Sequence, residues 1–223
     1  MGDKVETKNY RLQLVISLIG IAILMFGVIL FNQNILMSLP LGVRAVLGVL
    51  LHWGPAIVPI IIMILNKEGL RELGFSKEKL GLQILIGIII ALAMSFAFTL
   101  IPILFGFKDM VGSTTYTKLW QFIYEFAYCI LGVAFAEEFI FRGFIFYKLL
   151  QIKRSRKHAI IISSLLFGIY HIFSGNIIQV FMTFLIGLFL SMCREKIKNC
   201  TITSLIVAHG VYDALIVVLV AIL

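Results

Sequence analysis

Long, almost uninterrupted apolar runs limit more than any other feature how this chain can fold. An α-helix needs about twenty consecutive apolar residues to cross the hydrocarbon core of a bilayer. Seven stretches meet or approach that length, at residues 12–31, 45–65, 81–105, 118–138, 159–173, 177–193 and 201–222. The whole chain is 61% apolar and only 13% charged, unlike a soluble domain. The sequence therefore predicts an all-α, polytopic transmembrane helical bundle of about seven spans.

The first apolar run follows Lys4, Lys8 and Arg11, as the apolar part of a secretory signal peptide would. It is longer than such a part, and no small-x-small cleavage site follows it. We expect it to be retained as a membrane span.

Lys and Arg gather in every second connection between the predicted spans. The rich connections lie at 66–79, 153–157 and 194–198, and the others carry only Arg44, Lys108 and Lys118. Because cytoplasmic loops are the ones enriched in Lys and Arg, the pattern predicts a cytoplasmic N-terminus and an external C-terminus. The net charge of +8 then reflects topology. No basic stripe or aromatic platform is visible, so we expect the lipid bilayer and no nucleic acid as a partner.

No solenoid-like repeat, low-complexity tail or linker divides the sequence. We expect residues 1–223 to form a single membrane-embedded domain. The connection NKEGLRELGFSKEKLG (66–81) places Leu70, Leu73 and Phe75 among charges. It is either an additional short helix on the cytoplasmic interface or a solvated loop.

Ionisable residues inside the predicted spans gather in the second half of the chain. Each costs on the order of 2.5–3.5 kcal/mol at the centre of a membrane, so each needs a reason. They are Glu125, Glu137, Glu138, Arg142, His171, His209 and Asp213, while the earlier spans contain only His52. We therefore predict that residues 1–117 are supporting helices and that residues 118–223 form the catalytic core.

Helical spacing divides these residues into pairs. Glu138 and Arg142 lie four residues apart, as do Phe167 and His171, and His209 and Asp213, so each pair shares one helix face. Glu137 points about 100° away from Glu138 on a regular helix. One glutamate can thus form a buried ion pair with Arg142 while the other faces a cavity. Desolvation would make that second carboxylate a general base toward water.

Two histidines on other helices complete what a hydrolase needs, because one can share the proton of the attacking water and the other can donate to an oxyanion. Other interpretations stay open. The polar residues could also form packing contacts between helices, a proton relay in a small transporter, or a zinc site built from Glu and His. Neither H-E-x-x-H nor G-x-S-x-G is present. Glu125 is interpreted as a packing or cavity residue, and His52 as an interfacial residue.

Three short motifs occur in or at the end of three separate apolar runs: E-E-x-x-x-R at 137–142, F-x-x-x-H at 167–171 and H-x-x-x-D at 209–213. In this order they resemble the CAAX protease and bacteriocin-processing (CPBP, Abi) family of glutamate intramembrane endopeptidases. The resemblance covers about a third of the chain, and the first three spans match only in being hydrophobic.

The resemblance implies an all-helical membrane endopeptidase with no cofactor, zinc being the alternative. It implies that Glu137 and His171 activate water and that His209 with Asp213 forms the oxyanion side. Glu138, Arg142 and Phe167 would support the site. Prenyl-protein proteases have Asn where this chain has Asp213, and an ionised aspartate cannot donate to an oxyanion. Either Asp213 is protonated, or it orients His209 by accepting its N–H.

The expected substrates are peptides or membrane-associated proteins, in a prokaryotic cytoplasmic membrane. The resemblance points to bacteriocin maturation, self-immunity, processing of peptide signals or regulation by cleavage of membrane proteins. The alternative within the family is a non-catalytic immunity or scaffold protein.

Counting residues gives unequal depths for the site residues. Glu137 falls toward the cytoplasmic end of its span, His209 about 12 Å from the cytoplasmic side and His171 about 20 Å. Tilted helices, or a break near Gly143, would bring them together. We expect a water-filled cavity that opens to the cytoplasm.

Overall fold

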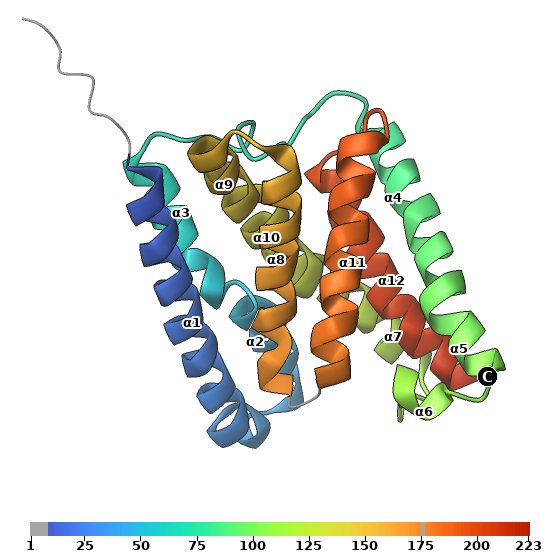
Figure 1. Cartoon of the computed structure of the whole chain (residues 1–223). Helices are drawn as coiled ribbons and strands as arrows, with labels where there is room; N and C mark the ends of the chain where they lie inside the picture. Colours follow the sequence, from blue (N-terminus) through green and yellow to red (C-terminus); the bar gives the residue numbers. More distant parts are fainter. Residues whose placement is uncertain (1–8, 175–176) are drawn as a thin grey trace, which may run out of the picture.

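The computed structural model describes residues 9–174 and 177–223, and every regular element in this part of the chain is a helix (Figure 1). Among these residues, five helices are long and apolar enough to cross a membrane, at 10–38, 41–65, 80–104, 177–196 and 202–222. The helical elements they contain are α1 (Tyr10–Asn34), η1 (Leu36–Ser38), α2 (Leu41–Leu51), η2 (Gly54–Ala56), α3 (Ile57–Leu65), α4 (Leu80–Ser95), η3 (Phe96–Leu100), α5 (Ile101–Leu104), α11 (Ile177–Lys196) and α12 (Ile202–Ile222). The predicted all-α bundle is confirmed.

The other two predicted spans are helical but are not among these five. One belongs to an unbroken helical run, 119–153, made of α7 (Leu119–Ala127), η4 (Tyr128–Ala134), α8 (Phe135–Glu138), η5 (Phe139–Ile145) and α9 (Phe146–Lys153). The other is α10 (Arg156–Tyr170), which continues into the short 3₁₀ helix η6 (His171–Ser174). These two segments carry the E-E-x-x-x-R and F-x-x-x-H motifs.

The helical run 119–153 contains two π-helical segments, η4 and η5, on either side of the glutamate pair. A π turn holds more residues than an α turn, so it changes which residues face a given neighbour without ending the helix. Of the two alternatives, tilted helices or a break near Gly143, the break is therefore not observed. Gly143 lies within η5 and the helix continues through it.

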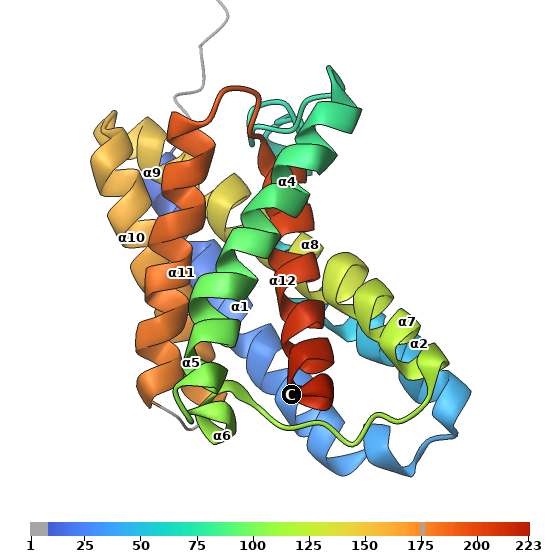
Figure 2. The same ribbon diagram turned by 90° about the vertical axis from the view of Figure 1, so that its right-hand side faces the viewer.

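Small residues allow the helices of the second half to approach closely. A Cβ atom at Gly87 of α4 would lie 2.6 Å from the backbone oxygen of Ser204 in α12. A Cβ atom at Gly210 of α12 would lie 2.6 Å from the Cα atom of Ile130 in η4. Close backbone approach at small residues is typical of helix packing in membranes. α12 is thereby held between α4 and the glutamate-bearing run (Figure 2).

The connection 66–79 contains turns and no helix, so of the two alternatives that the sequence left open the loop is the one observed. Gly74 has a φ of +97°, which a helix cannot include. The segment is nevertheless packed onto the bundle. The Leu73 side chain is fully buried, and Glu68 forms an ion pair of 2.5 Å with the buried Lys148 of α9.

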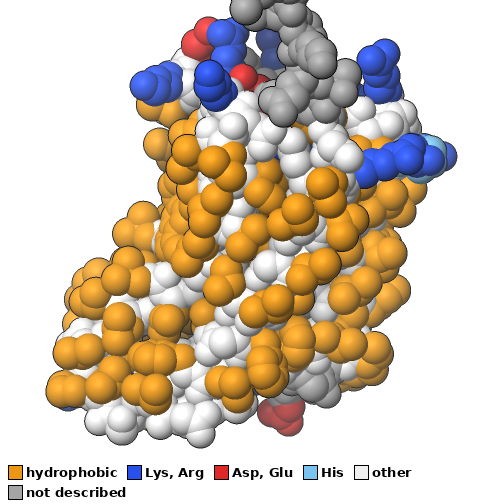
Figure 3. Space-filling model, turned by 90° about the vertical axis from the view of Figure 1, so that its left-hand side faces the viewer, with side chains coloured by type: hydrophobic (Ala, Val, Ile, Leu, Met, Phe, Trp, Pro, Cys, Tyr) orange, Lys and Arg blue, Asp and Glu red, His pale blue; other side chains and the backbone are white. Residues whose placement is uncertain are grey.

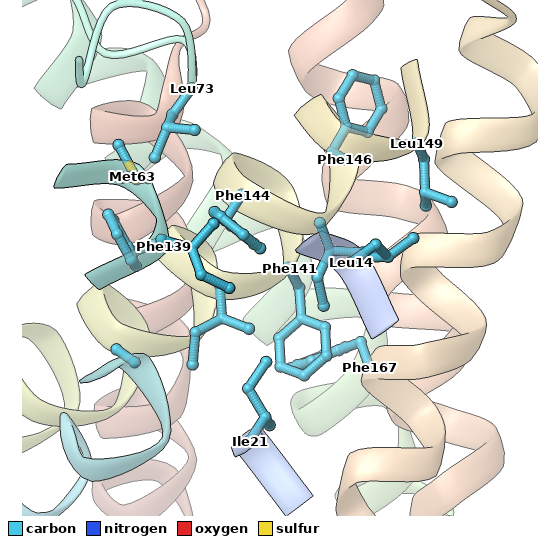
Figure 4. Close-up of a cluster of buried hydrophobic side chains, with 14 of the residues drawn as sticks. Leu14, Ile21, Met63, Leu73, Phe139, Phe141, Phe144, Phe146, Leu149 and Phe167 are labelled. Carbon is cyan, nitrogen blue, oxygen red and sulfur yellow. The ribbon is translucent and has the colours of Figure 1, made fainter. Parts of the chain in front are cut away.

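The core next to the glutamate pair is built from aromatic side chains. Phe139, Phe141 and Phe144 of η5 are buried together with Phe167 of α10 (Figure 4). Apolar side chains from α1, α3 and the connection 66–79 complete this cluster, namely Leu14, Ile21, Met63 and Leu73. The polar residues of the E-E-x-x-x-R motif thus sit in a closely packed apolar frame.

The outer surface agrees with a position in a membrane. Large apolar side chains cover the sides of the molecule, and Lys and Arg gather at the end where α1 begins (Figure 3). The three cation-rich connections join α3 to α4, α9 to α10 and α11 to α12, and all of them lie at that end (Figure 1). We call this the cation-rich end and the opposite one the cation-poor end.

Candidate active site

The two adjacent glutamates contact His209 from different sides. Glu138 is fully buried, and its Oε1 atom accepts hydrogen bonds from Arg142 Nη1 at 3.0 Å and His209 Nδ1 at 2.8 Å. The Oε2 atom of Glu137 lies 3.8 Å from His209 Nε2, and its Oε1 atom lies 4.0 Å from His171 Nε2. One carboxylate is thus held by direct hydrogen bonds, whereas the other stands at distances that a water molecule can bridge.

Arg142 is a fully buried cation held by a carboxylate and by an aromatic ring. Its Nε and Nη2 atoms have no hydrogen-bond partner among residues 9–174 and 177–223. Its guanidinium carbon lies 4.0 Å from the ring centroid of Phe167, a favourable cation–π distance. The same ring makes an edge contact with His171 at 4.8 Å between centroids. Phe167 therefore packs against both the supporting arginine and a candidate catalytic histidine.

His171 lies where α10 ends, immediately before the backbone turns into η6. Its Nδ1 atom lies 2.9 Å from the carbonyl oxygen of Phe167. Because a carbonyl oxygen only accepts, Nδ1 carries a proton, and in the neutral ring Nε2 holds the lone pair. This nitrogen is the one that faces Glu137.

His209 lies between three carboxylates. Besides the contacts with both glutamates, its Nε2 atom is 3.2 Å from Asp213 Oδ2, one helical turn along α12. Both ring nitrogens therefore have a carboxylate oxygen within hydrogen-bond distance. This geometry favours Asp213 as an acceptor that orients His209 over a protonated Asp213 that donates.

Glu137, His171, His209 and Asp213 line one cavity of about 1050 Å³. Most of its other walls are apolar or aromatic. They come from α1, α5, α6 (Lys108–Val111), η6 and α11, as well as from α12. Small-molecule sites are commonly about 300–1,000 Å³, so this cavity has room for several peptide residues.

The cavity extends toward the cation-poor end. Its outer walls include Phe105 and Met110, which follow α5, Phe173 in η6, and Ile178 in the first turn of α11. All four are more than half exposed, and their helix ends lie away from the cation-rich connections (Figure 1). A cytoplasmic N-terminus and a cavity open to the cytoplasm, both expected from the sequence, therefore cannot both hold in this structure.

The unequal depths expected from the sequence are reconciled by where the helices start. Ile202, the first residue of α12, is fully buried and donates its N–H to the carbonyl oxygen of Gly74, so α12 begins below the surface. Glu137 also lies near the middle of the helical run 119–153, not at the end of a span. α12 is tilted relative to α11 (Figure 1), which brings His209 to the level of Glu137.

Residues 118–215 match the family model described as Type II CAAX prenyl endopeptidase Rce1-like. The matched segment contains all three motifs that line or support the cavity. This segment is similar to the CAAX protease family. The resemblance predicted from the motifs is thereby confirmed. No curated protein and no solved structure matches the chain. The five apolar helices and the Rce1-like segment point to an integral membrane protein, and the family that this segment resembles is a peptidase family.

His52 is the polar residue whose position the sequence misjudged. It lines the cavity in the middle of the second span, where α2 ends, and is not at the membrane interface. Its Nε2 atom is 2.7 Å from the hydroxyl of Tyr128 in the Rce1-like segment. The signal available in the sequence was its place inside the apolar run 45–65, seven residues after its start.

Glu125 is not among the residues that line the cavity. Its Oε2 atom accepts a hydrogen bond of 2.9 Å from the hydroxyl of Tyr116, in the connection before α7. Burial, followed by this hydrogen bond, raises the pKa of Tyr116 to about 12, so that hydroxyl stays protonated at neutral pH. Glu125 therefore fastens the connection to the Rce1-like segment.

No group of three or more His, Cys, Asp or Glu side chains arranged to hold a metal ion occurs within residues 9–174 and 177–223. His209 in particular directs both ring nitrogens at carboxylates. A metal ligand needs a lone pair on the nitrogen that binds, so zinc would require this arrangement to change.

Proposed function

We propose that this protein is an intramembrane endopeptidase that hydrolyses peptide bonds of membrane-associated peptides or proteins without a metal ion. The observation that carries the proposal is the convergence of Glu137, His171 and His209, from three separate helical segments, at one wall of a cavity large enough for a peptide. The match to a peptidase family supports the same chemistry.

In this mechanism Glu137 and His171 share the proton of the attacking water. The water oxygen attacks the carbonyl carbon of the scissile bond while its proton passes to the Glu137 carboxylate, with His171 Nε2 as the second acceptor. A tetrahedral oxyanion forms. When it collapses, the C–N bond breaks and the stored proton goes to the leaving amine. The products are one carboxylate and one amine.

His209 is the group proposed to stabilise the oxyanion. Its Nε2 atom lies 3.2 Å from Asp213 Oδ2 and 3.8 Å from Glu137 Oε2. A small rotation of the imidazole ring would therefore direct the Nε2–H group to the negative charge that develops on the oxyanion. Glu138, by accepting a hydrogen bond from Nδ1, orients the imidazole ring. Arg142 in turn balances the charge of Glu138.

The direct test is peptide cleavage by purified protein in detergent, on a quenched library of hydrophobic and prenylated peptides. Removing a general base lowers the rate by about 10²- to 10⁴-fold, so Glu137→Gln should lose activity to that extent. Glu125→Gln is the matched control, since it changes a carboxylate on the same helical run outside the cavity. That control should cleave at the wild-type rate.

A chelator separates the two mechanistic classes. Activity that survives chelation and is absent in Glu137→Gln supports a metal-independent glutamate mechanism. Activity lost on chelation and restored by Zn²⁺ would replace it with a zinc mechanism. Equal cleavage by wild type and Glu137→Gln would remove Glu137 as the base, and no cleavage of any peptide would favour a non-catalytic immunity or scaffold role.

A further inference from the structure

We propose that the active-site cavity is entered from the external, cation-poor side of the membrane, and that it takes an apolar peptide segment presented there. This inference rests on the proposed function and adds the side from which the substrate comes. Two features decide this side. The first is which end of the protein faces the cytoplasm, and the second is toward which end the cavity opens.

The orientation of the molecule follows from its charges. The connections at the cation-rich end carry Lys and Arg at 67, 71, 77 and 79, then at 153, 154, 156 and 157, and finally at 194, 196 and 198. Those at the cation-poor end carry Arg44, Lys108 and Lys118. Because Lys and Arg in short loops are retained on the cytoplasmic side, the cation-rich end faces the cytoplasm.

The depth of the site is asymmetric within the membrane. His171 lies 15 residues beyond the start of α10 at the cation-rich end, or about 22 Å along the helix. Glu137 lies 16 residues before the end of α9 at the same end, or about 24 Å. The hydrocarbon core is about 30 Å thick, so both residues are nearer to the external surface than to the cytoplasmic one.

Packed side chains close the cytoplasmic route to the site. Phe144, Ile145 and Leu73 are fully buried between the cation-rich end and the glutamate pair. Arg194 donates to the carbonyl oxygens of Arg142 and of Leu73, the latter at 3.0 Å, and so ties the connection 66–79 to η5 and α11. On the external side, by contrast, exposed Phe105, Met110 and Phe173 form the walls of the cavity itself.

The chemistry of the walls selects the occupant. The cavity is lined by no Lys or Arg among the described residues, and its acidic groups are Glu137 and Asp213. The outer walls offer Phe, Met and Ile side chains, and α11 adds Gln179 and Thr183. An apolar peptide segment can bury its side chains there, whereas an acidic segment would meet the two carboxylates.

Single cysteines test which side the entrance faces. Native Cys129, Cys193 and Cys200 are buried, and burial also raises the pKa of Cys200 to about 11, so background reaction with a maleimide is low. In whole cells, an impermeant maleimide should label Met110→Cys and Phe105→Cys and spare Lys77→Cys and Lys198→Cys. Labelling of the lysine positions instead would overturn the proposal.

Two cleavage experiments test directly how the substrate enters the cavity: one blocks the entrance with a label, and the other compares vesicles of opposite orientation. Attaching a bulky maleimide to Met110→Cys should abolish cleavage relative to the same variant unlabelled, and labelling Lys198→Cys should not. Right-side-out vesicles should cleave a membrane-impermeant apolar peptide, while inverted vesicles should require permeabilisation. Cleavage by inverted vesicles without permeabilisation, or an unaffected labelled Met110→Cys, would overturn external entry. Failure to cleave in detergent would instead overturn the proposed function.

Discussion

At the scale of single residues, the two carboxylates of the E-E-x-x-x-R motif have different surroundings. Glu138 holds neighbouring side chains in place by hydrogen bonds, and Glu137 faces the cavity. Glu138 accepts two direct hydrogen bonds, from Arg142 and His209, and is not itself among the residues that line the cavity. Glu137 lines the cavity and stands about one water molecule away from two imidazoles. Adjacent residues can take these different roles because successive side chains on a helix point about 100° apart.

Arg142 should matter for stability far more than a surface arginine. Removing one member of a buried ion pair costs about 3–5 kcal/mol, so Arg142→Ala should lower the free energy of unfolding by that order. Arg156→Ala is the matched change, because Arg156 pairs with Glu195 while largely exposed, and its expected cost is at most about 1 kcal/mol. Denaturant unfolding in detergent micelles measures both. Equal, small losses would contradict a structural role for the buried pair.

Asp213 should act through the orientation of His209. Asn at this position keeps an oxygen that accepts from Nε2–H, whereas Ala removes it. A hydrogen bond to a charged group contributes about 1.5–3 kcal/mol, so Asp213→Ala should lower kcat about 10- to 100-fold. Asp213→Asn should retain more activity than Asp213→Ala. Steady-state kinetics on one peptide decides this, and the reverse order of the two variants would favour a protonated, donating Asp213.

At the scale of elements, close helix contacts set the positions of the reactive groups. Gly210 follows His209 on α12 and touches η4, the π-helical segment just before the glutamates. Gly168 follows Phe167 on α10, and a Cβ atom there would lie 2.8 Å from the backbone oxygen of Val180 in α11. The two histidine-bearing helices are thus each fixed by a glycine next to a motif residue.

Gly210→Ala should therefore disturb the site. Its Cβ atom would lie 2.6 Å from Ile130 Cα and 3.0 Å from the backbone oxygen of Cys129, and backbone atoms cannot move aside cheaply. Overpacking typically costs about 1–3 kcal/mol, and we expect lower stability together with lower kcat. Gly27→Ala in α1 is the control, since nothing lies within 4 Å and alanine favours a helix by up to about 1 kcal/mol. Comparable losses in both variants would argue against this contact.

At the scale of the whole molecule, the two ends of the bundle are built differently. The cation-rich end is packed, with Arg194 and Lys148 bonded into it, and the cation-poor end contains the cavity. The first half of the chain also forms part of the cavity wall, through Met25 and His52. Residues 1–117 thus do more than support the catalytic core.

The direction of the bundle predicts the position of its termini. α12 begins at the cation-rich end and Leu223 lies at the opposite end (Figure 1). A reporter enzyme that folds only when its disulfides form should be active when fused after Leu223 and inactive when fused before Met1. Assays of the two fusions in intact cells check this. The opposite pattern would reverse the topology and place the cavity on the cytoplasmic side.

The sequence predicted well the features that depend on helical periodicity and on the free energy of placing polar groups in a membrane. Apolar runs of membrane length specify helices because lipid offers the backbone no other partner. The i, i+4 spacing of Glu138 and Arg142 implied their ion pair, and the motifs implied the family. The sequence left a loop at 66–81 open as one alternative but did not predict that it packs onto the bundle, since Leu73 is buried by contacts that come from elsewhere in the chain.

The sequence by itself determined the membrane class, the helical content, the three motifs and the distribution of cations. Only the tertiary structure decided that the helical run 119–153 passes Gly143 unbroken, that His52 lies in the cavity wall and that the cavity extends toward the cation-poor end. The physical reason is the distance along the chain over which each property is determined. Helix formation and charge sidedness depend on neighbours within a few turns, whereas depth, tilt and the shape of a cavity depend on how distant helices pack.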